Sequence, residues 1–92
     1  MRYVKINGGT ATVKVDGRYD LCNTLDVMAE LEMSFLNGCT KVKVDFSDTS
    51  EIDSAVIRDL QKICKRVKEE NFTVSGAKEK VAQELKAAKL VG

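Results

Sequence analysis

The sequence predicts an α/β fold, a two-layer sandwich in which helices cover one face of a four-stranded mixed sheet. In the segments that favour strands, apolar residues alternate with polar ones, so each strand has one face for a core and one for water. Segments with helical spacing follow them, in the order β-β-α-β-α-β-α. A parallel sheet covered on both faces would contain continuous apolar runs, so the helices should lie on one side.

The first sixteen residues predict a β-hairpin. Residues 2–6 and residues 10–16 both alternate, and their apolar side chains fall on one face: Val4, Ile6, Ala11, Val13 and Val15. Asn7-Gly8-Gly9 between them is a tight-turn sequence, because glycine adopts a positive φ at little steric cost.

A helix is predicted from about Thr24 to Leu36. Asp16-Gly17 marks the exit from the second strand, and residues 20–23 lead into the helix, with Asn23 or Thr24 as its N-cap. Asn37-Gly38 is a typical helix end. The residues with helical spacing are Leu21, Leu25, Met28, Leu31 or Glu32, and Phe35.

The remaining elements alternate between strand and helix. Residues 40–46 give the clearest strand, residues 47–53 predict a polar loop, and a second helix runs from about Ser54 to Glu69. Residues 72–75 predict a short strand, and a third helix runs from about Lys78 to Leu90. Right-handed crossovers should make the last two strands parallel to their neighbours. The apolar stripes of the two helices are Val56 or Ile57, Leu60, Ile63 or Cys64, and Val67 in the second, and Val81, Leu85 and Ala88 in the third.

Composition indicates one globular domain over residues 1–92, since 43% of the 92 residues are hydrophobic and 32% are charged. The net charge is +1 with both signs mixed, so the chain lacks the electrostatic footprint of a nucleic-acid-binding protein. A basic group at 62–68 lies beside Glu69 and Glu70 and is interpreted as a solvated helix face. No segment approaches the roughly 18–20 apolar residues of a membrane helix, and the start carries no signal-peptide core, so we expect a cytoplasmic protein.

The residue types of common catalytic sites are missing. The chain has no histidine, which excludes a Ser-His-Asp set and the commonest zinc ligand. Its three cysteines form no CxxC pair, and no phosphate-binding glycine loop is present, so neither a metal site nor a cofactor is predicted. These features favour a protein that is not an enzyme.

The segment from Val42 to Leu60 reads VKVDFSDTSEIDSAVIRDL: a strand ends in aspartate, a loop follows, and Ile52-Asp53-Ser54 begins a helix. This arrangement resembles the STAS domain family, in particular the bacterial anti-sigma-factor antagonists. The hairpin exit Val15-Asp16-Gly17-Arg18-Tyr19-Asp20 and the strand Phe72 to Gly76 also match the family pattern, so the resemblance covers nearly the whole chain. Two positions depart from it, since Ala55 stands in place of the usual serine or threonine and Val56 in place of glycine.

The resemblance implies a protein-binding regulator. In anti-sigma-factor antagonists, the serine after the aspartate is phosphorylated by a partner kinase that doubles as the anti-sigma factor, and the matching residue here is Ser54. A hydroxyl at a helix N-terminus suits this role, because free amides and the helix dipole stabilise an added phosphate. The expected partner surface combines the 17–23 loop, the 47–53 loop and the start of the second helix, with Asp20, Asp53, Ser54, Val56 and Arg58 as its residues.

Three other interpretations stay open. Ser54 would merely cap the second helix if its hydroxyl bound the helix amides. The protein would be a constitutive STAS-type adaptor, for example of a lipid ABC transporter or a signalling complex, if Ser54 is never modified. Asp20, Asp45 and Asp53 together would form an acidic Mg²⁺ pocket in a small phosphoryl-accepting enzyme, although the chain is too short for a receiver domain. The sequence leaves the oligomeric state undetermined.

Overall fold

The main sheet has four strands in the spatial order β1-β2-β4-β6. In this computed structural model, which describes residues 1–90, they span β1 (Val4–Asn7), β2 (Thr10–Lys14), β4 (Lys41–Asp45) and β6 (Phe72–Ser75). β1 and β2 form the predicted antiparallel hairpin. β4 lies parallel to both β2 and β6, as right-handed crossovers require. The predicted four-stranded mixed sheet is therefore confirmed.

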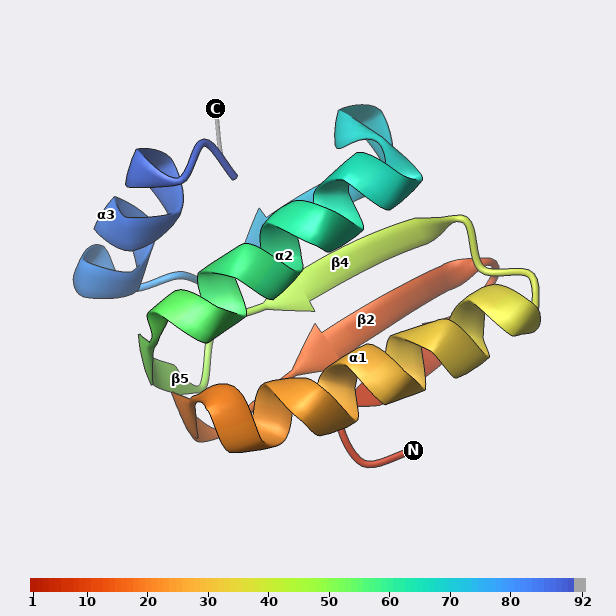
Figure 1. Ribbon diagram of the computed structural model, residues 1–92, viewed down its shortest axis with the longest axis horizontal. Helices are drawn as coiled ribbons and strands as arrows, with labels where there is room; N and C mark the ends of the chain where they lie inside the picture. Colours follow the sequence, from red (N-terminus) through yellow and green to blue (C-terminus); the bar gives the residue numbers. More distant parts are fainter. Residues whose placement is uncertain (91–92) are drawn as a thin grey trace.

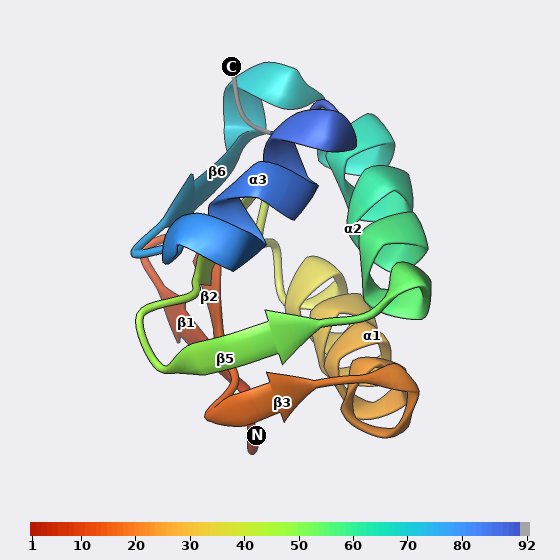
Figure 2. The same cartoon turned by 90° about the vertical axis from the view of Figure 1, so that its left-hand side faces the viewer.

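Three helices pack on one face of this sheet: α1 (Leu21–Leu36), α2 (Ser54–Val67) and α3 (Glu79–Ala87). Figure 1 shows α1 and α2 side by side across β2 and β4, and Figure 2 shows α3 beside β6 on the same side. A 3-10 turn, η1 (Glu69–Asn71), joins α2 to β6. None of the helices within residues 1–90 has the length and apolar content needed to cross a bilayer.

Two further strands, absent from the predicted order, form a small parallel sheet. β3 (Gly17–Tyr19) pairs with β5 (Thr49–Ile52), so the polar loop predicted at 47–53 is partly a strand. Strands of three and four residues are too short for an alternating pattern, and the register shifts between Gly17 and Arg18. Their pairing stacks Tyr19 opposite Ile52, and both side chains are buried.

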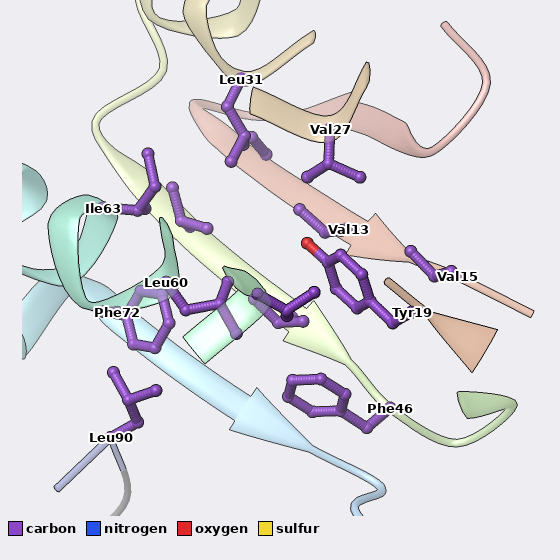
Figure 3. Close-up of a cluster of buried hydrophobic side chains, with 14 of the residues drawn as sticks. Val13, Val15, Tyr19, Val27, Leu31, Phe46, Leu60, Ile63, Phe72 and Leu90 are labelled. Atoms are coloured by element: carbon purple, nitrogen blue, oxygen red, sulfur yellow. The ribbon is translucent and has the colours of Figure 1, made fainter. Parts of the chain in front are cut away.

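The core lies between the main sheet and the helices and is largely aliphatic (Figure 3). The alternating apolar residues of β2 and β4 point into it as predicted, together with Val4 of β1, and α2 adds Val56, Leu60 and Ile63. Ile6 of β1, predicted on the same face, is instead 40% exposed. Tyr19 and Phe46 are the largest fully buried side chains. The small sheet therefore shares one core with the main sheet and fixes the turns that precede α1 and α2.

The predicted start and part of the predicted inner face of α1 are wrong, whereas its predicted end at Leu36 is confirmed. The helix begins at Leu21, capped by Asp20 and not by Asn23 or Thr24. Its buried residues are Thr24, Val27, Leu31 and Ser34, whereas Leu21 and Leu25 of the predicted stripe are mostly exposed. Helical spacing failed to identify the inner face because apolar residues occur on both sides of this helix.

Candidate functional site

The pairing of β3 with β5 brings two strand-to-helix turns together. Each of these strands runs into a helix, β3 through Asp20 into α1 and β5 through Asp53 into α2 (Figure 2). Because the two strands are parallel, both helices begin at the same edge of the molecule. The 17–23 and 47–53 segments, predicted to form one surface, are therefore neighbours in the structure.

Asp53 holds the N-termini of both helices. One oxygen of its carboxylate, Oδ1, accepts hydrogen bonds from the amides of Ala55 at 3.1 Å and Val56 at 3.2 Å, which makes Asp53 the N-cap of α2. The other oxygen, Oδ2, accepts from the amide of Leu21 at 3.1 Å, in the first turn of α1. A single side chain thus satisfies amides that a helix start leaves without partners, and it does so in two helices.

Asp20 has a similar role in α1 alone. Its Oδ1 accepts from the amides of Cys22 at 3.0 Å and Asn23 at 3.2 Å. The Asn23 side chain binds back to the preceding residues. Its Oδ1 accepts a hydrogen bond from the amide of Asp20 at 2.7 Å, and its Nδ2 donates to the carbonyl of Arg18 at 2.7 Å. Asn23 therefore completes a capping box as the third residue of the helix, although either Asn23 or Thr24 was predicted as the cap itself.

Ser54 is the first residue of α2 and is exposed. Because Asp53 caps the helix, the Ser54 hydroxyl is not needed for that purpose, and it makes no hydrogen bond to any residue within 1–90. Arg58 lies one turn further along α2, is also exposed, and has no acidic partner in the described part of the chain. The first turn of α2 thus presents a free hydroxyl with a free guanidinium four residues away.

Val56 does not belong to this surface. It has an exposed fraction of 0% and packs in the core, so its side chain cannot touch a partner of the folded domain. Its contribution to the turn is its backbone amide, which Asp53 binds. A valine in place of glycine therefore leaves the approach to Ser54 open, because its bulk points inward.

The neighbouring charges are mostly paired. Arg18 lies 3.4 Å from Glu51 across the β3–β5 pair, and Lys14 lies 3.0 Å from Asp48. The Asp48 carboxylate raises the pKa of Lys14 above its ordinary value. The surface around Ser54 therefore carries little unpaired charge of its own beyond Arg58.

The three aspartates proposed as a Mg²⁺ pocket each have another role. Asp20 and Asp53 cap helices. Asp45 accepts from the amide of Ser47 at 2.9 Å, a hydrogen bond that lowers the pKa of its carboxyl. Within residues 1–90 no three acidic, cysteine or histidine side chains form a group that could hold a metal ion.

The sequence did not indicate two residues that shape the candidate site. Leu21 links the two turns through its amide, a backbone role that side-chain patterns do not reveal. Thr24 is buried, and its hydroxyl donates to Asp59 at 3.0 Å, which ties α1 to α2 one turn below the site. The spacing Asp20-x-x-Asn23 resembles a capping box and was the signal available for the helix start.

The family model described as STAS domain matches residues 2–92. The chain belongs to the STAS domain family. A search of curated proteins finds no significant match to this STAS domain.

Solved structures share the fold of this STAS domain. A crystal structure of a putative anti-sigma factor antagonist (TM1081) from Thermotoga maritima superposes with a TM-score of 0.79 at 23% identity, over 95% of this chain and 77% of that one. An NMR structure of TM1081 gives 0.80 at 22% identity, over 98% and 74%. A crystal structure of Mglu gives 0.63 at 17% identity, over 87% of this chain and 20% of the other. At these identities the likeness concerns the fold.

Proposed function

We propose that this STAS domain is a non-catalytic, protein-binding regulator of the anti-sigma factor antagonist type, and that phosphorylation of Ser54 is its switch. The observation that carries the proposal is that Asp53 caps α2 and leaves the Ser54 hydroxyl exposed and without a partner. Capping, the simplest other role for a serine at this position, is already performed by its neighbour. The description of TM1081 as a putative anti-sigma factor antagonist supports the same class.

The surroundings of Ser54 suit an added phosphate. The phosphate would carry a charge of about −1.5 to −2 at pH 7 and would sit at the positive end of the helix dipole. Arg58 is four residues along the same helix face, within reach of a phosphate on Ser54. Phosphorylation would therefore add negative charge to the surface and also withdraw Arg58 from a carboxylate of the partner.

The partner expected at this surface is an anti-sigma factor or a related serine kinase, so the proposed function belongs in the cytoplasm. It would contact Ser54 and Arg58 directly. Asp53 and Asp20 would act mainly by fixing the two turns, because their carboxylates are engaged by helix amides. The exposed side chain of Leu21 adds an apolar contact at the edge of the surface.

The test compares wild type, Ser54→Ala and Ser54→Asp in pull-downs from a lysate of the native organism, with mass spectrometry of Ser54. Thr73→Asp is the control, because it adds the same charge at an exposed hydroxyl residue of β6, outside the expected partner surface. We expect a kinase-like protein to bind wild type, Ser54→Ala and Thr73→Asp but not Ser54→Asp, and phosphate to appear on Ser54 of the wild type.

A different result would favour a different function. If all four forms retain the same complex and Ser54 is never phosphorylated, the domain is a constitutive adaptor of a transporter or signalling complex and the switch is wrong. Circular dichroism of each variant separates this result from loss of folding.

A further inference from the structure

The two edge strands of the main sheet differ in how they are covered. In the order β1-β2-β4-β6, strand β6 pairs with β4 on one side and has no partner strand within residues 1–90 on the other. At the opposite edge α1 closes β1, because Glu30 accepts hydrogen bonds from the amides of Tyr3 at 2.8 Å and Val4 at 3.0 Å. Among residues 1–90 no side chain closes β6 in this way. The free edge of the sheet is therefore β6.

Val74 directs its backbone groups out of this free edge. In a parallel pair, a residue that bonds to the neighbouring strand turns both its N–H and its C=O toward it, and the next residue turns both away. The carbonyl of Ser75 accepts from the amide of Phe46 at 2.8 Å, so Ser75 and, two residues before it, Thr73 face β4. Val74 therefore faces outward, and neither of its backbone groups has a hydrogen-bond partner within residues 1–90. Such an edge is a template for one more strand.

A groove of about 710 Å³ runs along this edge. Phe72 and Val74 of β6 line one side of it, and Lys86, Lys89 and Leu90 line the other, at the C-terminal end of α3. We call it the β6 groove. Figure 2 shows β6 at the margin of the sheet with α3 beside it. Its volume lies within the range of about 300–1,000 Å³ that ordinary binding clefts have.

The charge around the β6 groove is mainly positive. A second hollow of about 360 Å³ adjoins it through shared lining residues and adds Lys65 and Lys68, from the end of α2, to Lys86 and Lys89. Within residues 1–90, Glu69 is the one acidic residue that lines either hollow, and none of the four lysines forms a salt bridge. Four unpaired ammonium groups against one carboxylate favour a negatively charged occupant.

The four lysines do not protect the edge strand itself. Proteins prevent unwanted strand pairing by placing charged residues or proline on the edge strand. The sequence of β6 is FTVS, which contains neither, whereas the lysines belong to the ends of α2 and α3. Lys68 and Lys89 are also the two non-glycine residues within 1–90 that have a positive φ, at 78° and 60°. Uncommon backbone conformations of this kind cluster at functional sites.

We propose that the β6 groove binds an extended acidic segment of a partner protein, which adds to the main sheet as a fifth strand. The backbone of the segment bonds to the outward groups of Val74, and its aspartate or glutamate side chains meet the lysines. The groove is separate from the Ser54 surface, because about 16 Å of helix α2 lies between Ser54 and Lys65. The proposal does not depend on the role of Ser54.

An NMR titration of the full, isotope-labelled chain tests the proposal. The probe is a short peptide that alternates Glu with Val, and the control peptide alternates Lys with Val. We expect the Glu peptide to bind with a Kd below about 1 mM and the Lys peptide not to bind. At saturation the Val74 amide should exchange with solvent about fivefold more slowly, because it gains a hydrogen bond. The Thr73 amide already bonds to β4 and is the internal reference, which should change little.

Charge reversal separates the β6 groove from general attraction to the domain. Lys86→Glu combined with Lys89→Glu should weaken binding of the Glu peptide about tenfold or more, because each attraction becomes a repulsion. Lys5→Glu combined with Lys80→Glu is the matched control, since it changes the net charge equally at exposed lysines that line neither hollow. At physiological salt this control should bind within about twofold of the wild type. Circular dichroism checks that both variants are folded.

Three results would overturn the proposal. The first is a Glu peptide that does not bind at concentrations up to about 1 mM. The second is binding that leaves exchange of the Val74 amide unchanged, which would show that the lysines attract the peptide without forming a fifth strand. The third is a domain that binds vesicles of anionic phospholipid in place of the peptide, which would make the lysines a membrane contact.

Discussion

Asp53 is the residue on which the geometry of the site depends. It accepts three backbone hydrogen bonds, two from α2 and one from α1, so it sets both where α2 begins and how the two turns lie relative to each other. Ser54 beside it makes no hydrogen bond within residues 1–90 and is exposed. Neighbouring residues therefore differ in role: Asp53 stabilises the helix start, and Ser54 leaves its hydroxyl exposed.

The stabilities of Asp53→Ala and Ser54→Ala test this division. Loss of an N-cap costs about 0.5–2 kcal/mol, and Asp53→Ala also removes the acceptor of the Leu21 amide, so we expect its free energy of unfolding to fall by about 1–2 kcal/mol. Ser54→Ala should change it by less than about 0.5 kcal/mol. Urea denaturation measures both. If Ser54→Ala costs as much as Asp53→Ala, the serine is the cap and its hydroxyl is not free.

Gly76 is a second residue whose identity the packing requires. Its φ is +72°, and a Cβ placed there would lie 2.9 Å from the backbone nitrogen of Ser47. Gly8 also has a positive φ, +56°, but has no atom near the position of a Cβ. We expect Gly76→Ala to cost about 3 kcal/mol, from backbone strain and the clash together, and Gly8→Ala about 1 kcal/mol from strain alone. If thermal or urea denaturation gives the same loss of stability for Gly76→Ala and Gly8→Ala, the backbone at Ser47 moves aside without cost and the clash is absent.

At the scale of elements, the strands and helices that the sequence predicted correctly were those with one unambiguous apolar face. The strand at 40–46 and α2 have such a face, and both were placed within a few residues. α1 has two apolar faces, so its periodicity could not identify which one the core covers. β3 and β5 are stabilised by their pairing with each other, a contact between distant segments that no local pattern contains. The structure therefore places the 17–23 and 47–53 segments side by side, through a strand pairing that the sequence did not predict.

The end of α2 contains a strained residue. Lys68 has φ 78° and ψ 151°, a region that glycine adopts but other residues rarely do, and such a conformation costs on the order of 1–3 kcal/mol. Lys68→Gly should therefore raise the free energy of unfolding by about 1 kcal/mol, after the greater chain entropy of glycine in the unfolded state is included. Lys65→Gly, in the last turn of α2, is the control and should lower it by about 1 kcal/mol. If urea denaturation shows Lys68→Gly to be less stable than the wild type, the backbone at Lys68 is not strained.

At the scale of the whole molecule, the two-layer arrangement was predictable because each strand of the main sheet has a polar face. Lys5, Thr12, Lys43 and Thr73 form one row across its open side, and such residues exclude a second layer of helices. The inner faces build a single core that includes the small sheet through Tyr19 (Figure 3). Because the domain has a single core, ionisation of the buried Tyr19 phenol should change the free energy of unfolding of the whole domain.

The pH dependence of stability follows from the burial of Tyr19. Its hydroxyl has no hydrogen-bond partner within residues 1–90, and the hydroxyl of Thr24 donates its proton to Asp59. Burial raises the pKa of Tyr19 well above its usual range. Both states keep the proton below about pH 10, but above it the unfolded chain releases the proton first. The free energy of unfolding should then fall by up to about 1.4 kcal/mol per pH unit.

Tyr19→Phe isolates this effect. At neutral pH it removes a buried hydroxyl without a partner, so its stability should stay within about 1 kcal/mol of the wild type. Above about pH 10 the free energy of unfolding of Tyr19→Phe should exceed that of the wild type by an amount that grows with each pH unit, because the variant has no phenol at position 19 to ionise. Tyr3→Phe removes a tyrosine that is not fully buried and serves as the control, which should follow the wild type. Urea denaturation from pH 8 to about pH 11 measures the free energy of unfolding of all three proteins. If that free energy changes with pH in the same way for the wild type and Tyr19→Phe, Tyr19 ionises as readily in the folded domain as in the unfolded chain.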